Sequence, residues 1–178
     1  MNKQSKRIIG MFARYFALLL IGSGNLYVIY AILTPLTVRV TTAVVSIFTP
    51  TTLVGNLIGT AGVTIEIIPA CVAGAAFYLL LILTLSTPNV KPITRTKAIL
   101  TAIAILFALN ITRILILIPL IKSNYFQTIH WLTWHVASTI FVVATWLVII
   151  KIYKIKSIPI YSDIKYLSNT IKNPKRKK

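Results

Sequence analysis

Four long stretches of the chain carry almost no charge, and no other sequence feature constrains the fold as strongly. Residues 15–38, 67–90 and 123–150 contain no Lys, Arg, Asp or Glu, and residues 98–121 contain only Arg113. Each stretch exceeds the roughly 20 apolar residues that a helix needs to cross a bilayer. With 57% hydrophobic and 12% charged residues, the chain is too apolar for an ordinary soluble domain. The sequence therefore predicts an all-α, polytopic membrane helix bundle with about four transmembrane helices.

Turn residues set the expected ends of these helices. Pro35 and the turn around Pro88 predict the ends of the first two. The expected spans are about 15–36, 69–87, 98–121 and 127–150. The first apolar stretch is too long for a cleaved signal peptide. A single transmembrane domain then covers residues 1–160, and residues 161–178 are predicted to form a disordered, basic cytoplasmic tail.

The basic residues predict the orientation. Sixteen of the nineteen lie before the first span, between the second and third, or after the fourth. Only Arg39 and Lys122 fall on the other side. Because basic residues concentrate on the cytoplasmic side, both termini of this multi-pass chain are predicted to be cytoplasmic. The net charge of +17 therefore indicates a cell membrane rather than a nucleic acid as the partner.

The segment 39–66, which this orientation places outside, allows several structures. It is rich in Val, Ile and Thr, with Pro50 and several glycines as breaks. Residues 40–48 are compatible with an interfacial helix, a re-entrant piece or one strand of a small outer cap. A complete crossing would contradict the charge pattern, so the segment is expected to lie outside or half-embedded.

Side chains that can perform chemistry are few. The chain has one cysteine, two histidines and two acids, and it has no zinc or phosphate-loop motif. No metal or cofactor is expected. Arg113 is the strongest signal, because a cation within a transmembrane helix usually faces the bundle interior and marks function. The structural alternatives are an arginine that reaches the outer headgroups or one that pairs with a backbone carbonyl.

Cys71 follows Pro69 at the start of the second span. A helix that begins at Pro69 places Cys71 in its first turn, where the helix dipole favours a thiolate. The alternative is a small, buried apolar residue, which is the commoner role of a single cysteine in a membrane helix. Cys71 alone does not decide between them.

The two histidines lie on the last span. Because the turn before it is short, residues equally distant from the turn should lie at the same depth, and this places Arg113 level with His130. His135 is about one and a half turns deeper and roughly 140° around the helix from His130. His130 is therefore the preferred functional histidine and His135 the alternative. For either one, the structural role is that of an aromatic side chain packed on a neighbour.

Cys71, Arg113 and His130 are thus expected in the outer parts of three different helices. A thiol, an imidazole and a guanidinium suffice for covalent acyl transfer. The imidazole deprotonates the thiol, the thiolate attacks a carbonyl, and the guanidinium stabilises the oxyanion. The imidazolium then protonates the leaving amine, and a second nucleophile resolves the thioester.

Three sequence blocks resemble the archaeosortase branch of the exosortase/archaeosortase family. They are IIPACVAGAAFYLLLILTLSTP, ALNITRILIL and IHWLTWHVASTIFVVATW, within residues 38–150. The resemblance implies a cysteine transpeptidase with Cys71, Arg113 and His130 as its catalytic residues, supported by Gly74 and Asn110. It implies an outward-facing site that cleaves C-terminal sorting tags of secreted proteins. The new C-terminus is then transferred to a lipid-type acceptor.

Glu66 precedes Cys71 by five residues and is a further candidate. It is expected either to orient the arginine or the histidine, to bind the tag, or simply to be solvated. Hydrolysis without transfer remains a variant of the enzyme hypothesis, because only the acceptor differs. The non-enzymatic alternatives are a membrane scaffold and a small transporter subunit.

Overall fold

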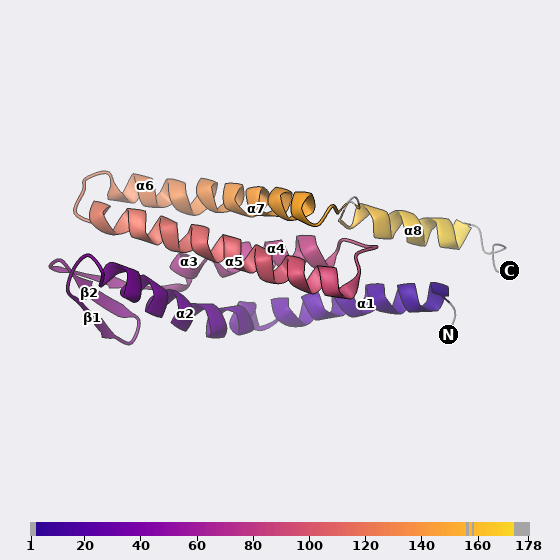
Figure 1. Cartoon of the computed structure of the whole chain (residues 1–178), viewed down its shortest axis with the longest axis horizontal. Coiled ribbons are helices and arrows are strands. Elements are labelled where there is room, and N and C mark those ends of the chain that lie inside the picture. The colour runs from indigo at the N-terminus through magenta and orange to yellow at the C-terminus, as the bar shows by residue number, and fades with distance from the viewer. Residues whose placement is uncertain (1–2, 156, 158, 173–178) are drawn as a thin grey trace.

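The computed structural model describes residues 3–155, 157 and 159–172 as an elongated helical bundle with a small sheet at one end (Figure 1). The helices are α1 (Lys3–Gly22), η1 (Gly24–Leu26), α2 (Tyr27–Val45), α3 (Pro69–Val72), α4 (Gly74–Leu85), α5 (Pro92–Leu117), η2 (Ile118–Leu120), α6 (Phe126–Leu132), the π-helical turn η3 (Thr133–Ala137), α7 (Ser138–Ile152) and α8 (Tyr161–Lys172). The strands are β1 (Thr51–Val54), β2 (Leu57–Thr60) and β3 (Val63–Glu66).

The helices pack mainly along their length. Helices α4, α5 and α7 contact one another, α2 packs on α3, α4 and α5, and α1 contacts α4. Helix α1 continues approximately in line with α2, and α8 continues beyond α7 (Figure 1). The sheet lies at the end of the bundle opposite both termini. The predicted helical bundle is therefore confirmed in its main architecture.

Three helical segments of the described chain are long and apolar enough to cross a membrane: Gly24–Val45, Pro92–Leu120 and Phe126–Ile152. The first predicted span, 15–36, is wrong, because the helix breaks between Gly22 and Tyr27. Asn25 and Leu26 adopt positive φ angles of 54° and 61° at this break. The Gly-Ser-Gly-Asn sequence explains the interruption, since these residues favour turns. Pro35 does not end a helix but lies inside α2.

The second predicted span, 69–87, is shorter and interrupted. Residues Pro69–Leu85 cover roughly 25 Å along a helix axis, less than the hydrocarbon core of about 30 Å. The predicted end near Pro88 is confirmed, since α4 stops at Leu85. The third helix starts six residues earlier than predicted, at Pro92. The fourth agrees closely with its predicted range.

The outer segment is neither an interfacial helix nor wholly helical, so the all-α prediction is wrong there. Its first residues complete α2, and the rest forms an antiparallel sheet in the order β1-β2-β3. Thr51 pairs with Thr60, and Thr60 pairs with Val63. Ala61 and Gly62 form the second hairpin turn, and both have positive φ angles, as a tight two-residue turn requires.

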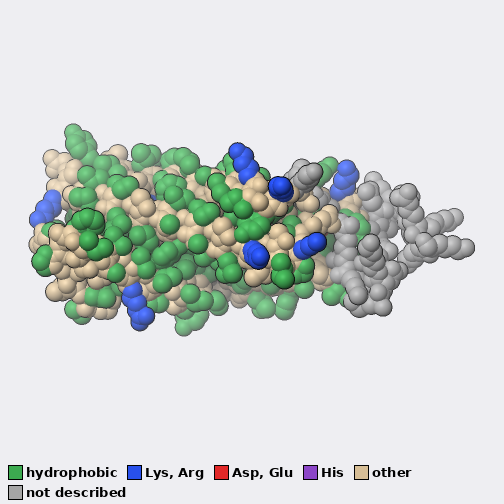
Figure 2. Space-filling model, viewed as in Figure 1, with side chains coloured by type: hydrophobic (Ala, Val, Ile, Leu, Met, Phe, Trp, Pro, Cys, Tyr) green, Lys and Arg blue, Asp and Glu red, His purple; other side chains and the backbone are tan. Residues whose placement is uncertain are grey.

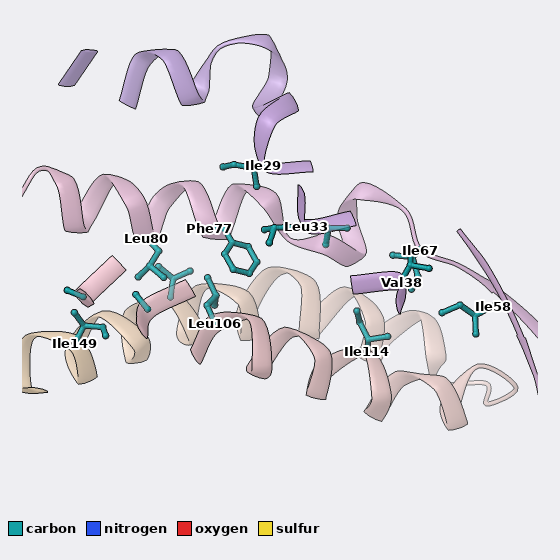
Figure 3. Close-up of a cluster of buried hydrophobic side chains, with 14 residues drawn as sticks. Ile29, Leu33, Val38, Ile58, Ile67, Phe77, Leu80, Leu106, Ile114 and Ile149 are labelled. Atoms are coloured by element: carbon teal, nitrogen blue, oxygen red, sulfur yellow. The ribbon is translucent and has the colours of Figure 1, made fainter. Parts of the chain in front are cut away.

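A continuous apolar core follows the length of the bundle (Figure 3). It begins at Ile58 in the sheet, passes Phe77 of α4 and Leu106 of α5, and ends near Ile149 of α7. These side chains are at most 2% exposed. The sheet therefore shares its core with the helices and is fixed to the end of the bundle.

The bundle surface is also apolar. Large side chains such as Phe12, Leu19, Ile32, Leu100 and Leu147 are at least half exposed. Figure 2 shows apolar atoms spread over much of the visible face, with Lys and Arg gathered mainly towards the end that carries the termini. A soluble domain rarely exposes so much contiguous apolar surface, whereas a helix in contact with lipid does.

The end of the bundle near the termini is joined by an ion pair. Arg14 of α1 donates to the Asp163 carboxylate at 2.9 Å, and Asp163 is only 4% exposed. Arg14 also donates to the carbonyls of Leu85 and Thr87 at the end of α4. The predicted disorder from residue 161 is therefore wrong for 161–172, which form α8; residues 173–178 lie outside the described part.

The Asp163 contact predicts that this buried carboxylate holds α8 to the bundle. Asp163→Asn should accelerate amide hydrogen exchange across residues 161–172, because a neutral amide cannot replace the ion pair with Arg14. Lys165→Gln is the matched control, since Lys165 is exposed on the same helix. Equal exchange in wild type and Asp163→Asn would show that other contacts hold α8.

Two glycines pack against tyrosines of the neighbouring helix. A Cβ atom on Gly74 would lie 2.6 Å from the Tyr30 ring, and one on Gly22 would lie 2.3 Å from the Tyr78 hydroxyl. Gly74→Ala should therefore lower the free energy of unfolding by about 1–3 kcal/mol. Gly10→Ala is the control, because nothing lies within 4 Å of that position, and it should be neutral or stabilise by up to about 1 kcal/mol. Thermal unfolding in detergent measures both, and equal effects would contradict the packing argument.

Candidate active site at a helix break

The second apolar segment is broken beside Cys71. Helix α3 has only four residues, and Ala73 follows it in the left-handed conformation with φ 59° and ψ 38°. Helix α4 starts anew at Gly74. Such a break removes the helical partners of the preceding carbonyls, those of Ala70, Cys71 and Val72. In an apolar bundle these oxygens need donors from elsewhere.

Helix α5 supplies those donors. Asn110 donates its side-chain amide to the Cys71 carbonyl at 2.9 Å and to the Val72 carbonyl at 3.4 Å. Arg113 donates through Nη2 to the carbonyls of Cys71 at 3.1 Å and Ala70 at 3.3 Å. The three-residue spacing of Asn110 and Arg113 places both side chains on one face of α5. Together they cap the broken helix.

Arg113 is buried and joins a third helix. Its side chain is 6% exposed, and Nη1 donates to the Ser138 hydroxyl of α7 at 2.9 Å. The Nε–H group is buried without a hydrogen-bond partner among the described residues. The prediction that this cation faces the bundle interior is therefore confirmed. The alternative of pairing with backbone carbonyls also describes its observed bonds.

Arg113 has no carboxylate partner in this part of the bundle. The chain contains two acids, Glu66 and Asp163. Asp163 pairs with Arg14. Glu66 is exposed at the end of β3, and its carboxylate makes no hydrogen bond or ion pair among the described residues. The predicted orienting role of Glu66 toward Arg113 has no contact to support it. The Cys71 thiol is free and partly buried, and the guanidinium of Arg113 bonds to the backbone carbonyl of the same residue.

The two histidines lie apart from this cluster. The His130 ring stacks on Phe126 with ring centroids 5.6 Å apart. The His135 ring lies between Trp131 and Trp134, at 4.6 Å and 4.5 Å, and its Nδ1 bonds to the Trp131 carbonyl at 3.0 Å. Among the described residues, no hydrogen bond or ring contact joins either histidine to Cys71 or Arg113.

The direction of helical side chains explains why Arg113 and His130 do not meet. The prediction that Arg113 and His130 lie at equal depth took only backbone positions into account. The observed partner of Arg113 is Ser138, eight residues beyond His130. Side chains of a helix lean toward its N-terminus. Because α5 and α6–α7 run in opposite directions (Figure 1), Arg113 leans toward the bundle centre and His130 leans away from it.

Ser138 is a site residue that the sequence analysis missed. A serine in an apolar helix resembles any small packing residue, and only its position opposite Arg113 distinguishes it. It also lines a cavity of about 230 Å³ between α4 and α7, together with Ala73, Ala76 and Trp134. Gly74, a predicted supporting residue, is buried at the start of α4 against Tyr30. The capped break therefore adjoins a cavity at the side of the bundle.

Within the part of the chain that the structure describes, no three His, Cys, Asp or Glu side chains gather as metal ligands do. The geometry defines a class: a helical bundle with helices long and apolar enough for a membrane, in which buried Asn110 and Arg113 bond to the backbone at a helix break beside a partly buried cysteine. No known protein family, curated protein or solved structure matches the chain.

The capping geometry predicts a graded loss of stability. Asn110→Leu should lower the free energy of unfolding by about 1–3 kcal/mol, because the Val72 carbonyl loses its side-chain donor and the Cys71 carbonyl keeps only Arg113. Arg113→Met should cost more, since it removes bonds to three acceptors. Ser138→Ala, which removes one bond, is expected to cost about 1 kcal/mol. Chemical unfolding in detergent tests this order, and a neutral Asn110→Leu would contradict the capping role.

Proposed function

We propose that the chain is a membrane-embedded cysteine protease and transpeptidase of the archaeosortase type. In this proposal Cys71 is the nucleophile, Arg113 stabilises the oxyanion, and a histidine of the last long helix transfers protons. The substrate is the C-terminal sorting tag of a secreted protein, and a lipid-type molecule accepts the new C-terminus. The sequence resemblance supports the substrate and the acceptor.

The proposed location is the cell membrane, with both termini in the cytoplasm. The sixteen basic residues on one side of the predicted spans support this orientation. The Lys and Arg side chains coloured in Figure 2 also lie mainly towards the end of the bundle that carries the termini. The sheet then faces outside. The helix break lies between the sheet and the membrane centre, so Cys71 is reached from the outer leaflet.

One observation carries the catalytic proposal: a buried arginine with no carboxylate partner among the described residues bonds to the backbone carbonyl of the only cysteine. A buried cation is costly unless an opposite charge or several hydrogen bonds compensate it. Negative charge that develops beside Cys71 during acyl transfer would supply the opposite charge. The unpartnered Nε–H of Arg113 is a remaining donor for a developing oxyanion.

The reaction then runs through a thioester. A histidine accepts the thiol proton, and the sulfur of Cys71 attacks the carbonyl carbon of the scissile peptide bond. The carbonyl oxygen takes the negative charge beside Arg113. Collapse of this intermediate breaks the C–N bond, and the imidazolium protonates the leaving amine. The acceptor nucleophile loses its proton to the imidazole as it attacks the thioester, which releases Cys71.

These reaction steps require an imidazole to approach the Cys71 thiol. Position along the helix supports His135 over His130, the residue preferred from sequence. His135 lies three residues from Ser138, which contacts Arg113, whereas His130 lies eight residues away. His135 lies within the π-helical turn η3, and such turns occur frequently at functional sites. Catalytic hydrogen bonds commonly tighten only when substrate binds.

A non-catalytic scaffold is the second candidate. The observation in its favour is that Asn110 and Arg113 already have a complete structural role, because their bonds satisfy the carbonyls at the break. In that case Cys71 is only a small residue beside the cap.

Replacement of Cys71 distinguishes the two candidates. In native cells, Cys71→Ala should cause secreted proteins that end in an apolar helix and a basic cluster to retain these ends, as measured by mass spectrometry of protein C-termini. Wild-type membranes should also contain a hydroxylamine-sensitive adduct on Cys71, which a thioester produces. His135→Ala and His130→Ala are compared in the same assay. The variant that abolishes the adduct identifies the proton-transfer residue.

The control is Ala104→Ser, a small change at an exposed position of α5 that leaves the thiol in place and lines neither of the two cavities. Thermal unfolding confirms that each variant is folded. Normal C-terminal processing by folded Cys71→Ala, with no adduct on the wild type, would overturn the enzyme proposal and support the scaffold.

A further inference from the structure

A second cavity lies at the sheet end of the bundle. It has a volume of about 420 Å³, within the range of roughly 300–1,000 Å³ typical of small-ligand sites. Its walls come from the end of α2, the turn between β2 and β3, and the end of α5 with η2. The lining includes Phe48, Thr49, Thr60, Val63, Leu115 and Lys122.

The cavity is apolar apart from two features. Thr49 and Thr60 bond to each other through their hydroxyls at 2.6 Å, so they engage one another rather than a ligand. Lys122 is exposed, and its Nζ lies near the β2–β3 turn, 4.0 Å from the position of a Cβ atom on Gly62. The walls therefore combine an apolar interior with one cation.

This cavity is separate from the helix break. Leu115 lies two residues after Arg113 on α5, which places their side chains about 200° apart around the helix. No lining residue contacts Cys71, Asn110 or Arg113 through a described hydrogen bond. Occupation of this cavity is therefore independent of the proposed catalysis.

We propose that this cavity binds one acyl chain of an anionic phospholipid, with the lipid phosphate beside Lys122. The surroundings point to a lipid rather than a water-soluble ligand, because Phe48 is 79% and Ile47 75% exposed beside the cavity. The charge is complementary, since no acid lines the walls. Glu66, the nearest acid in the sheet, lies three residues along β3 from Val63, roughly 10 Å away.

Native mass spectrometry of the full chain in neutral detergent tests the site with dioleoyl-phosphatidylglycerol. The wild type should retain one lipid. Lys122→Gln should weaken binding about tenfold, as loss of one charge-assisted contact does. Dioleoylglycerol, which lacks the phosphate, should bind the wild type about tenfold more weakly than dioleoyl-phosphatidylglycerol does. Leu115→Trp and Val63→Phe, which fill the cavity from the helix side and the sheet side, should abolish binding.

Arg39→Gln is the matched control, because Arg39 is the other exposed cation of the predicted outer side and does not line the cavity. It should bind like the wild type. An equal loss of lipid affinity in Arg39→Gln and Lys122→Gln would show that binding depends only on the general surface charge, and it would overturn the proposal. So would a wild type that retains no lipid, or retention by both cavity-filled variants in their folded state. A lipid-free dimer would assign the cavity to a second copy of the chain and also overturn it.

Discussion

The central part of the structure depends on the hydrogen bonds that Asn110 and Arg113 donate to the carbonyls at the helix break. A bundle with so few polar side chains has little else to satisfy backbone groups that leave a helix. The carbonyls at the other end of α4 are also bonded by arginines, because Arg14 and Arg95 donate to the carbonyl of Thr87. Arginines from other helices therefore hold the interrupted segment Pro69–Leu85 at both of its ends.

The two interrupted helices also position each other. Gly22 precedes the break between α1 and α2 and lies against Tyr78 of α4, while Gly74 follows the break before α4 and lies against Tyr30 of α2. Tyr78 further donates to the Leu18 carbonyl at 3.0 Å. At each break, a glycine thus lies against a neighbouring helix, and a tyrosine of that helix fills the space that the missing glycine side chain leaves. The position of Cys71 is consequently fixed by packing on one side and by capping on the other.

The charge pattern predicted the third and fourth helices and the buried position of Arg113, because burial of charge is a strong constraint on an apolar chain. It did not predict the break at Gly22, since a charge-free stretch contains no information on backbone conformation. The sheet was only one of several options, because Val-rich and Thr-rich sequence fits more than one structure. Ser138 was missed because its role exists only opposite Arg113, across two helices.

The capping role and the proposed catalytic role of Arg113 are compatible because they use different atoms. The two Nη atoms bond to the Ala70 and Cys71 carbonyls and to the Ser138 hydroxyl, which fixes the guanidinium plane. The Nε–H group stays without a partner in the described bundle. A donor held in place before the reaction stabilises developing charge without the cost of reorganisation. The same bonds that close the broken helix would therefore prepare the remaining N–H for an oxyanion beside Cys71.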